Sequence, residues 1–360
     1  MRWAGEQRRG GASPAHAADE GALAWAAALA ADAPVVSLEP RQVQPQMPTE
    51  LHVIFGTGPV GCWTARALCS QGRAVRAVNR SGARPGLMPT DVEMAKADVT
   101  DPTQAAGAAT GASVVYQALN PPYHLWHEFF PALQAAALSA AKTANARYVS
   151  IENLYMFDSS KPMTEASPVA PVSAKGELRK RMAEDVTAAH ARGEVRTTAL
   201  RSSDYYGPGV LGSALGERVF GNLVAGKKAQ ISGSTKMPHS FAYIEDVGLA
   251  AAALGTHDKA LGQVWIAPHA PARTQGHMVE EACRVLGVEP SISEVSPLMM
   301  RLVGLFIPAA RASVEMMYEF TAPFVADSSR IEREFSLSAT PIPAAMERTI
   351  AWYRDHLAKG

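Results

Sequence analysis

A glycine-rich loop placed directly after a short apolar run is the feature that most constrains the fold. Residues 51–55, Leu-His-Val-Ile-Phe, suit a buried parallel strand. Residues 56–61 read Gly-Thr-Gly-Pro-Val-Gly, and residues 62–70 have helical character. In such a unit the three glycines allow a tight turn, close approach of a pyrophosphate and close packing of helix on strand. The pattern predicts a dinucleotide site, with an ordinary glycine-rich turn as the alternative. Its residues are Gly56, Thr57, Gly58, Pro59, Val60 and Gly61.

Short apolar runs continue beyond this loop in alternation with helical segments. Residues 74–78, 93–97 and 113–118 predict three further strands. This order predicts an α/β protein with a Rossmann doubly wound parallel sheet, in which loops at the strands' carboxyl ends line the cofactor crevice. We therefore expect Asp98 near the adenine and the segment 118–120 near the ribose. The cofactor contacts expected from these loops are Asp98, Val99, Ala118, Leu119 and Asn120.

The loop after the second strand favours NADP over NAD, which remains possible. An NAD site usually has Asp or Glu there to accept a hydrogen bond from the ribose 2′-hydroxyl. Residues 79–82 are Asn-Arg-Ser-Gly and include no carboxylate. We expect Asn79 to hydrogen-bond the ribose and Arg80 to pair with a 2′-phosphate or stack on adenine. A solvated loop cation is the alternative for Arg80.

Composition argues against several classes of function. Lys and Arg together number 34, as do Asp and Glu, so no strongly charged face for nucleic acid or an anionic membrane is expected. Three cysteines are too few for a disulfide scaffold and lack metal-ligand spacing, which favours a cytoplasmic protein without a metal. The longest apolar stretch, residues 22–31, is shorter than the roughly 20 residues that span a bilayer. Acidic residues directly before that stretch disfavour a signal peptide.

The chain resembles the extended branch of the short-chain dehydrogenase/reductase superfamily, the NAD-dependent epimerases and dehydratases, from about residue 51 to its end. The first matches are the glycine loop, Ala-Asp-Val at 97–99 and Arg-Tyr-Val-Ser at 147–150. Two later segments are typical of this branch, Leu-Arg-Ser-Ser-Asp-Tyr-Tyr-Gly-Pro-Gly at 200–209 and Phe-Ala-Tyr-Ile-Glu-Asp-Val at 241–247. The resemblance implies an NAD(P)-dependent oxidoreductase or epimerase acting on an alcohol or carbonyl of a small molecule. It also implies a cofactor contact at Ser150 and a possible homodimer.

Composition and the resemblance together divide the chain into regions. Residues 1–46 lack a sustained apolar face and are expected to be a disordered tail or an upstream extension of the reading frame, with a targeting segment as the alternative. We expect the dinucleotide-binding domain over 47–208 and a smaller C-terminal substrate-binding region over 209–360, with 241–267 returning to the first domain. The Met-rich apolar run over 298–310 predicts core or a substrate lid, with a membrane-surface helix as the alternative.

The catalytic positions depart from the family pattern. The family uses Ser or Thr after the fifth strand and Tyr-x-x-x-Lys on the next helix. Lys175 matches the Lys, which the resemblance implies would hold the nicotinamide ribose. Position 171 is Pro, however, and Ile151 stands where the hydroxyl residue usually falls, with Ser150 one place early. The chain therefore resembles an atypical member.

A different acid is then needed, and the loops after the fourth and fifth strands offer candidates. These are the phenols of Tyr123 and Tyr155, together with Glu152 and Asn153, which are unusually polar for their place. A structural role for either tyrosine is the alternative. Two other functions stay open for the whole chain. One is an ene-reductase in which a displaced Tyr protonates the enolate, and the other is a non-catalytic regulator that senses NADP(H).

Overall fold

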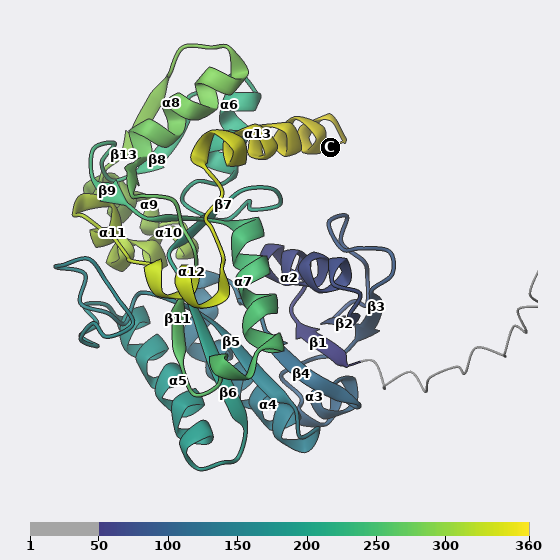
Figure 1. Ribbon diagram of the computed structural model, residues 1–360. Coiled ribbons are helices and arrows are strands. Elements are labelled where there is room, and N and C mark those ends of the chain that lie inside the picture. Colours follow the sequence, from purple (N-terminus) through teal and green to yellow (C-terminus); the bar gives the residue numbers. More distant parts are fainter. Residues whose placement is uncertain (1–49, 360) are drawn as a thin grey trace, which may run out of the picture. The chain divides into compact units, whose positions relative to one another are not determined.

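The computed structural model describes residues 50–359 (Figure 1). Seven parallel strands form its central sheet, in the order β11-β6-β5-β4-β1-β2-β3. Their bounds are β1 Leu51–Phe55, β2 Ala74–Asn79, β3 Glu93–Lys96, β4 Ala112–Gln117, β5 Arg147–Asn153, β6 Arg196–Ser202 and β11 Val264–Ile266. The strand order reverses between β1 and β4, and in sheets of this kind a ligand is expected to bind at the carboxyl ends of the strands where the order reverses. The predicted Rossmann doubly wound sheet is confirmed. The tail expected over 1–46 lies outside the described residues.

Helices cover both faces of this sheet (Figure 1). The helices α2 Pro59–Ser70 and α7 Ile244–Thr256 lie on one face, and α3 Pro102–Ala108, α4 Trp126–Thr143 and α5 Ala174–Ala191 lie on the other. Successive side chains of a strand point to opposite faces. In β1, accordingly, Ile54 packs with α2 and α7, whereas Val53 and Phe55 pack with α3 and α4. Continuous apolar runs therefore form the strands because both faces are covered.

The second half of the chain adds three two-stranded sheets, β10-β7, β12-β9 and β13-β8. The strands are β7 Asp204–Tyr206, β8 Ala229–Ser232, β9 Pro238–His239, β10 Phe241–Tyr243, β12 Arg273–Thr274 and β13 Ile292–Val295. The helices are α6 Asn222–Val224, α8 Gln275–Leu286, α9 Pro297–Gly304, α10 Pro308–Ser313, α11 Tyr318–Thr321, α12 Ser329–Phe335 and α13 Ile342–Lys359. The 3₁₀ turns are η1 Tyr123–Leu125, η3 Asp258–Ala260 and η4 Val314–Met316, and η2 Glu217–Gly221 is a π-helical turn.

A separate apolar cluster lies among these later elements and includes Phe220, Met278, Met346 and Tyr353. In contrast, α7 and β11 pack on the central sheet although they come late in the chain. The domain boundary expected at residue 208 stays a prediction. Within residues 50–359, no helix is both long and apolar enough to cross a bilayer.

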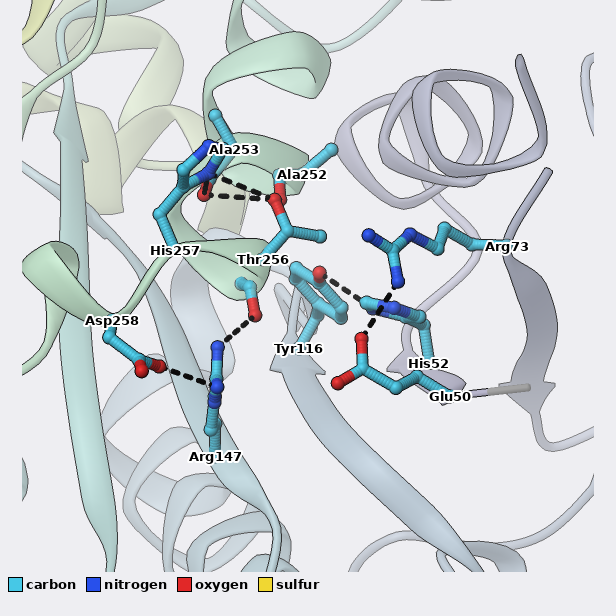
Figure 2. A network of polar contacts seen from close by, with 11 residues as sticks. Glu50, His52, Arg73, Tyr116, Arg147, Ala252, Ala253, Thr256, His257 and Asp258 are labelled. Atoms are coloured by element: carbon cyan, nitrogen blue, oxygen red, sulfur yellow. Dashed lines mark hydrogen bonds and ion pairs between the residues drawn. The ribbon is translucent and has the colours of Figure 1, made fainter. Parts of the chain in front are cut away.

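A buried histidine lies at the start of the sheet core. His52 in β1 is fully buried, and its Nδ1 lies 3.0 Å from the Tyr116 hydroxyl of β4 (Figure 2). Figure 2 also shows two arginines near His52 and Tyr116. These are Arg73, which pairs with Glu50, and Arg147. Burial, followed by the charges of Arg73 and Arg147, lowers the pKa of His52 to about 4. The imidazole is therefore neutral in the folded protein at neutral pH.

His52 is expected to make the protein less stable in acid. Its folded pKa of about 4 lies below its usual value of 6.5, so between these values the unfolded chain binds a proton that the folded chain does not. This difference lowers the free energy of unfolding by about 2 kcal/mol between roughly pH 7.5 and pH 5. Denaturant unfolding of wild type and His52→Gln at both pH values measures this contribution. Equal pH dependence of the two proteins would contradict the prediction.

Candidate active site

The glycine loop forms a cradle at the carboxyl end of β1. Gly56 has a φ of +103°, and a Cβ there would lie 2.5 Å from the Ala118 carbonyl oxygen of the loop after β4. A Cβ at Gly61 would lie 2.0 Å from the Gly56 carbonyl oxygen. At Gly58, which precedes α2, a Cβ would meet no atom of the described chain within 4 Å, and no side chain caps that helix. Free N–H groups at a helix start suit a phosphate, so the cradle fits the pyrophosphate of a dinucleotide.

Asn79 supports this loop from the end of β2. Its Nδ2 donates to Thr57 Oγ1 at 2.9 Å and to the Ala83 carbonyl oxygen at 2.8 Å, and its Oδ1 accepts from the Gly82 N–H at 2.6 Å. The amide is thus engaged within the loop, and the predicted ribose bond would have to compete with these contacts. The structure assigns Asn79 a positioning role that the sequence did not indicate.

Arg80 lies on the surface next to Asn79. It makes no hydrogen bond or ion pair with any residue in the range 50–359. The pKa of Asp98 is lowered, first by hydrogen bonds from Thr100 and more weakly by the charge of Arg80, so Arg80 and Asp98 lie near each other after β2 and β3. An exposed guanidinium can form a bidentate, charge-assisted pair with a phosphate group.

The other predicted cofactor residues differ in exposure. Val60 and Val99 are buried in the two apolar layers of the core, so their side chains contribute packing. Ala118 and Leu119 border Gly56, and Asn120 is exposed. Ser150 is fully buried within β5, and its hydroxyl has no hydrogen-bond partner among the described residues. Its contact with a cofactor stays a prediction.

Lys175, Tyr123 and Tyr155 come together although they lie far apart in the sequence. The Tyr123 hydroxyl donates to the Tyr155 hydroxyl at 2.9 Å, and Lys175 Nζ lies 4.8 Å from the centre of the Tyr123 ring. Trp126 stacks on Tyr155 at 6.2 Å between ring centres. Lys175 lies in the first turn of α5, whereas the two tyrosines follow β4 and β5, which are neighbours in the sheet. The sheet therefore brings both predicted acids to the predicted lysine.

Both phenols are held in the protonated form. Burial, followed by the Glu319 carboxylate, raises the pKa of Tyr123 and of Tyr155 well above the usual value of 10. A phenol with a raised pKa remains an acid at neutral pH. The pair can therefore donate a proton, but it is not poised to act as a base.

The polar residues of β5 have different roles. The Glu152 carboxylate is buried and accepts from Arg201 Nε of β6 at 2.9 Å, so it forms an internal ion pair. Asn153 Oδ1 accepts from the Tyr155 N–H at 3.4 Å and thereby holds the turn that carries this tyrosine. The structure thus places Asn153 beside the tyrosine pair and Glu152 within the core.

A buried acidic cluster beside the tyrosines was not predicted. His239 Nε2 lies 2.9 Å from Asp204 Oδ2, and its Nδ1 lies 3.1 Å from the carbonyl oxygen of Glu319. A carbonyl only accepts, so Nδ1 carries a proton. Burial, followed by the charge of Asp204, raises the pKa of Glu319 well above its usual value. Asp204 belongs to a segment that the resemblance singled out, but no local pattern pointed to Glu319.

Among residues 50–359, no group of three or more His, Cys, Asp or Glu side chains is arranged to hold a metal ion.

A family model described as the NAD dependent epimerase/dehydratase family matches residues 53–266. No curated protein matches the sequence. Among solved structures, the chain is similar to an epimerase from Methanothermobacter thermautotrophicus, with 15% identity over 86% of this chain and 94% of that one, at a TM-score of 0.72.

Two further structures are similar. One is the UDP-glucuronic acid 4-epimerase from Bacillus cereus in complex with UDP-glucuronic acid and NAD, at 16% identity over 85% of this chain and 99% of that one, with a TM-score of 0.70. The other is the dTDP-glucose 4,6-dehydratase from Bacillus anthracis in complex with NAD, at 13% identity, 85% and 97% coverage and a TM-score of 0.70. These likenesses confirm the fold.

Proposed function

The chain belongs to the NAD dependent epimerase/dehydratase family, and from that premise we propose an NAD(P)-dependent oxidoreductase or epimerase acting on a small-molecule alcohol or carbonyl. The observation that carries the proposal is the meeting of Lys175, Tyr123 and Tyr155 at the carboxyl edge of the sheet. Pro171 has no proton to donate, and the tyrosine pair supplies the missing phenol from a different loop.

The protonation state of the pair favours reduction. A nicotinamide bound over the crevice would supply the hydride to a carbonyl carbon. Tyr155 would then donate its proton to the carbonyl oxygen, because the Tyr123 hydroxyl proton already lies in the hydrogen bond to Tyr155. The carbonyl becomes an alcohol as the nicotinamide is oxidised. Asn153 and Trp126 hold Tyr155 in place for this transfer.

NADP is the proposed cofactor, and Arg80 is the residue that would select it. Arg80→Ala is expected to weaken NADPH binding about tenfold to a hundredfold, since one charge-assisted contact to the 2′-phosphate is worth ~1.5–3 kcal/mol. NADH lacks that phosphate, so its affinity should change little. Fluorescence titration of both cofactors measures the ratio. Equal weakening of both would contradict the role given to Arg80.

An ene-reductase is the second candidate, and the raised pKa of both phenols favours it. Protonation of an enolate carbon also needs a neutral acid, and an acid displaced from position 171 would approach a different substrate atom. In that reaction hydride adds to one alkene carbon and the phenol proton to the other.

Stopped-flow oxidation of NADPH against a panel of substrates tests both candidates. The panel should hold simple ketones, enones and oxidised sugar nucleotides, because the Bacillus cereus neighbour was solved with UDP-glucuronic acid and NAD. Turnover of carbonyls supports the first proposal, and turnover of enones alone supports the second. Tight NADPH binding without turnover of any substrate would favour a regulator. The homodimer stays a prediction.

A further inference from the structure

Lys175, which is expected to hold the cofactor, already donates hydrogen bonds to other residues of the chain. Lys175 Nζ donates to the Ala312 carbonyl oxygen at 2.7 Å and to Glu315 Oε1 at 2.6 Å. The Lys175 side chain is only 3% exposed. Both acceptors come from one short segment, α10 and η4, which lies about 140 residues further along the chain. Of the three donors on the ammonium, two are therefore engaged.

Glu315 also binds the backbone at the start of α5. Its second oxygen, Oε2, accepts from the Ala174 N–H at 2.7 Å and the Lys175 N–H at 3.4 Å. In addition, α10 packs against η1, the turn that carries Tyr123. One segment therefore covers both Lys175 and one member of the tyrosine pair.

A nicotinamide ribose would need the same donors. Its two hydroxyls present two oxygen acceptors to one ammonium, and the Ala312 carbonyl and the Glu315 carboxylate are likewise two oxygen acceptors. We infer, on the basis of the proposed function, that Glu315 and Ala312 occupy the ribose position on Lys175. The segment 308–316 must then withdraw before the nicotinamide half of the cofactor is held, and Glu315 is the positioning residue that controls this step.

The segment is built so that it can move. In α9, α10 and η4 the only buried residues are Met300, Gly304 and Met316. Apart from Met300, the large apolar side chains of α9 and of the loop after it are exposed, and Phe306 is 86% exposed. A hollow of about 380 Å³ is also lined by residues of α9, α10 and η4, with Glu315 among them. Few buried apolar contacts give a segment low local stability, so it can open without unfolding the sheet.

Binding of whole and half cofactors to the full chain tests this inference. Calorimetric titration should use NADPH and 2′,5′-ADP, which has the adenosine half but no nicotinamide ribose. Glu315→Gln removes the charge that competes for Lys175, so NADPH should bind about tenfold more tightly. Affinity for 2′,5′-ADP should not change. Glu347→Gln, which removes one exposed carboxylate from α13, is the matched control and should alter neither affinity.

The wild-type chain provides the same test without a substitution. Hydrogen exchange of the amides over 308–316 should become faster on addition of NADPH and stay unchanged with 2′,5′-ADP. Suppose that wild type and Glu315→Gln bind NADPH tightly and with equal affinity, and that hydrogen exchange over 308–316 does not change. The inference would then be wrong, whereas the proposed function would stand. Absence of NADPH and NADH binding in wild type and in both variants would overturn the proposed function and the inference together.

Discussion

Gly61→Ala is expected to lower the free energy of unfolding by about 3 kcal/mol or more, at the upper end of the cost of overpacking. A Cβ at this position would lie 2.0 Å from the Gly56 carbonyl oxygen and 3.3 Å from Ile54 Cγ2. The first of these atoms is backbone at the turn from β1 to α2, so it cannot move aside as a flexible side chain would. Either the turn distorts or α2 separates from the strand. Thermal and denaturant unfolding measure the loss, and dinucleotide binding should be lost with it.

Gly58→Ala is the matched variant, because the same methyl group is added three residues earlier in the same loop. Its Cβ would meet no atom of residues 50–359 within 4 Å, and its backbone is extended, at φ −70° and ψ −175°. The free energy of unfolding should therefore change by less than about 0.5 kcal/mol. Cofactor affinity should still fall by roughly tenfold or more, because the methyl group would occupy the space where the pyrophosphate approaches. Unchanged affinity in a stable Gly58→Ala protein would argue against a phosphate site in this loop.

The sheet could be predicted because its signals are local. Each strand is a short apolar run, and the glycine loop marks the crossover from the first strand to its helix. Covered faces make the strands apolar on both sides, as the packing of Val53, Ile54 and Phe55 shows. The right-handed connections usual between parallel strands then decide on which face of the sheet each connecting helix lies.

Part of the site could be predicted for the same reason. Tyr123 and Tyr155 were proposed separately because each follows a strand, and parallel neighbours β4 and β5 end at the same edge of the sheet. Lys175 was found through its match to the family helix. What the sequence could not show is that the phenols bond to each other, since that contact depends on the turn held by Asn153 and on Trp126.

The contacts from the C-terminal region could not be predicted. Glu315 lies in the 3₁₀ turn η4 and Glu319 in the short helix α11, neither with a periodic pattern. Their partners Lys175 and Asp204 are more than a hundred residues away. A glutamate on such a turn resembles any solvated surface carboxylate. The sequence predicts core or a substrate lid for the apolar run over 298–310, and the exposure of Phe306 excludes the core for this residue.

Tyr155→Phe is expected to lower the rate of hydride transfer to a carbonyl substrate by 10²–10⁴, the usual contribution of a positioned general acid. Tyr155 lies in the turn after β5, and its proton is the one that the pair leaves free, because Tyr123 donates to Tyr155. Tyr123→Phe keeps that phenol but removes the donor that orients it, so a smaller loss of about tenfold is expected. Single-turnover kinetics with NADPH measure both rates. Affinity for NADPH should stay unchanged, which separates loss of the acid from loss of the cofactor site.

The double variant decides whether the two phenols act as one unit. If Tyr123 acts only through Tyr155, the double variant should be no slower than Tyr155→Phe, because effects within one unit are not additive. Tyr148→Phe is the matched control, since its hydroxyl is buried in β5 with no hydrogen-bond partner among residues 50–359, and its removal should leave the rate unchanged. A double variant that still transfers hydride at the wild-type rate would show that the proton comes from another group. The tyrosine pair would then have a structural role. A different acid would have to replace the phenol that Pro171 lacks.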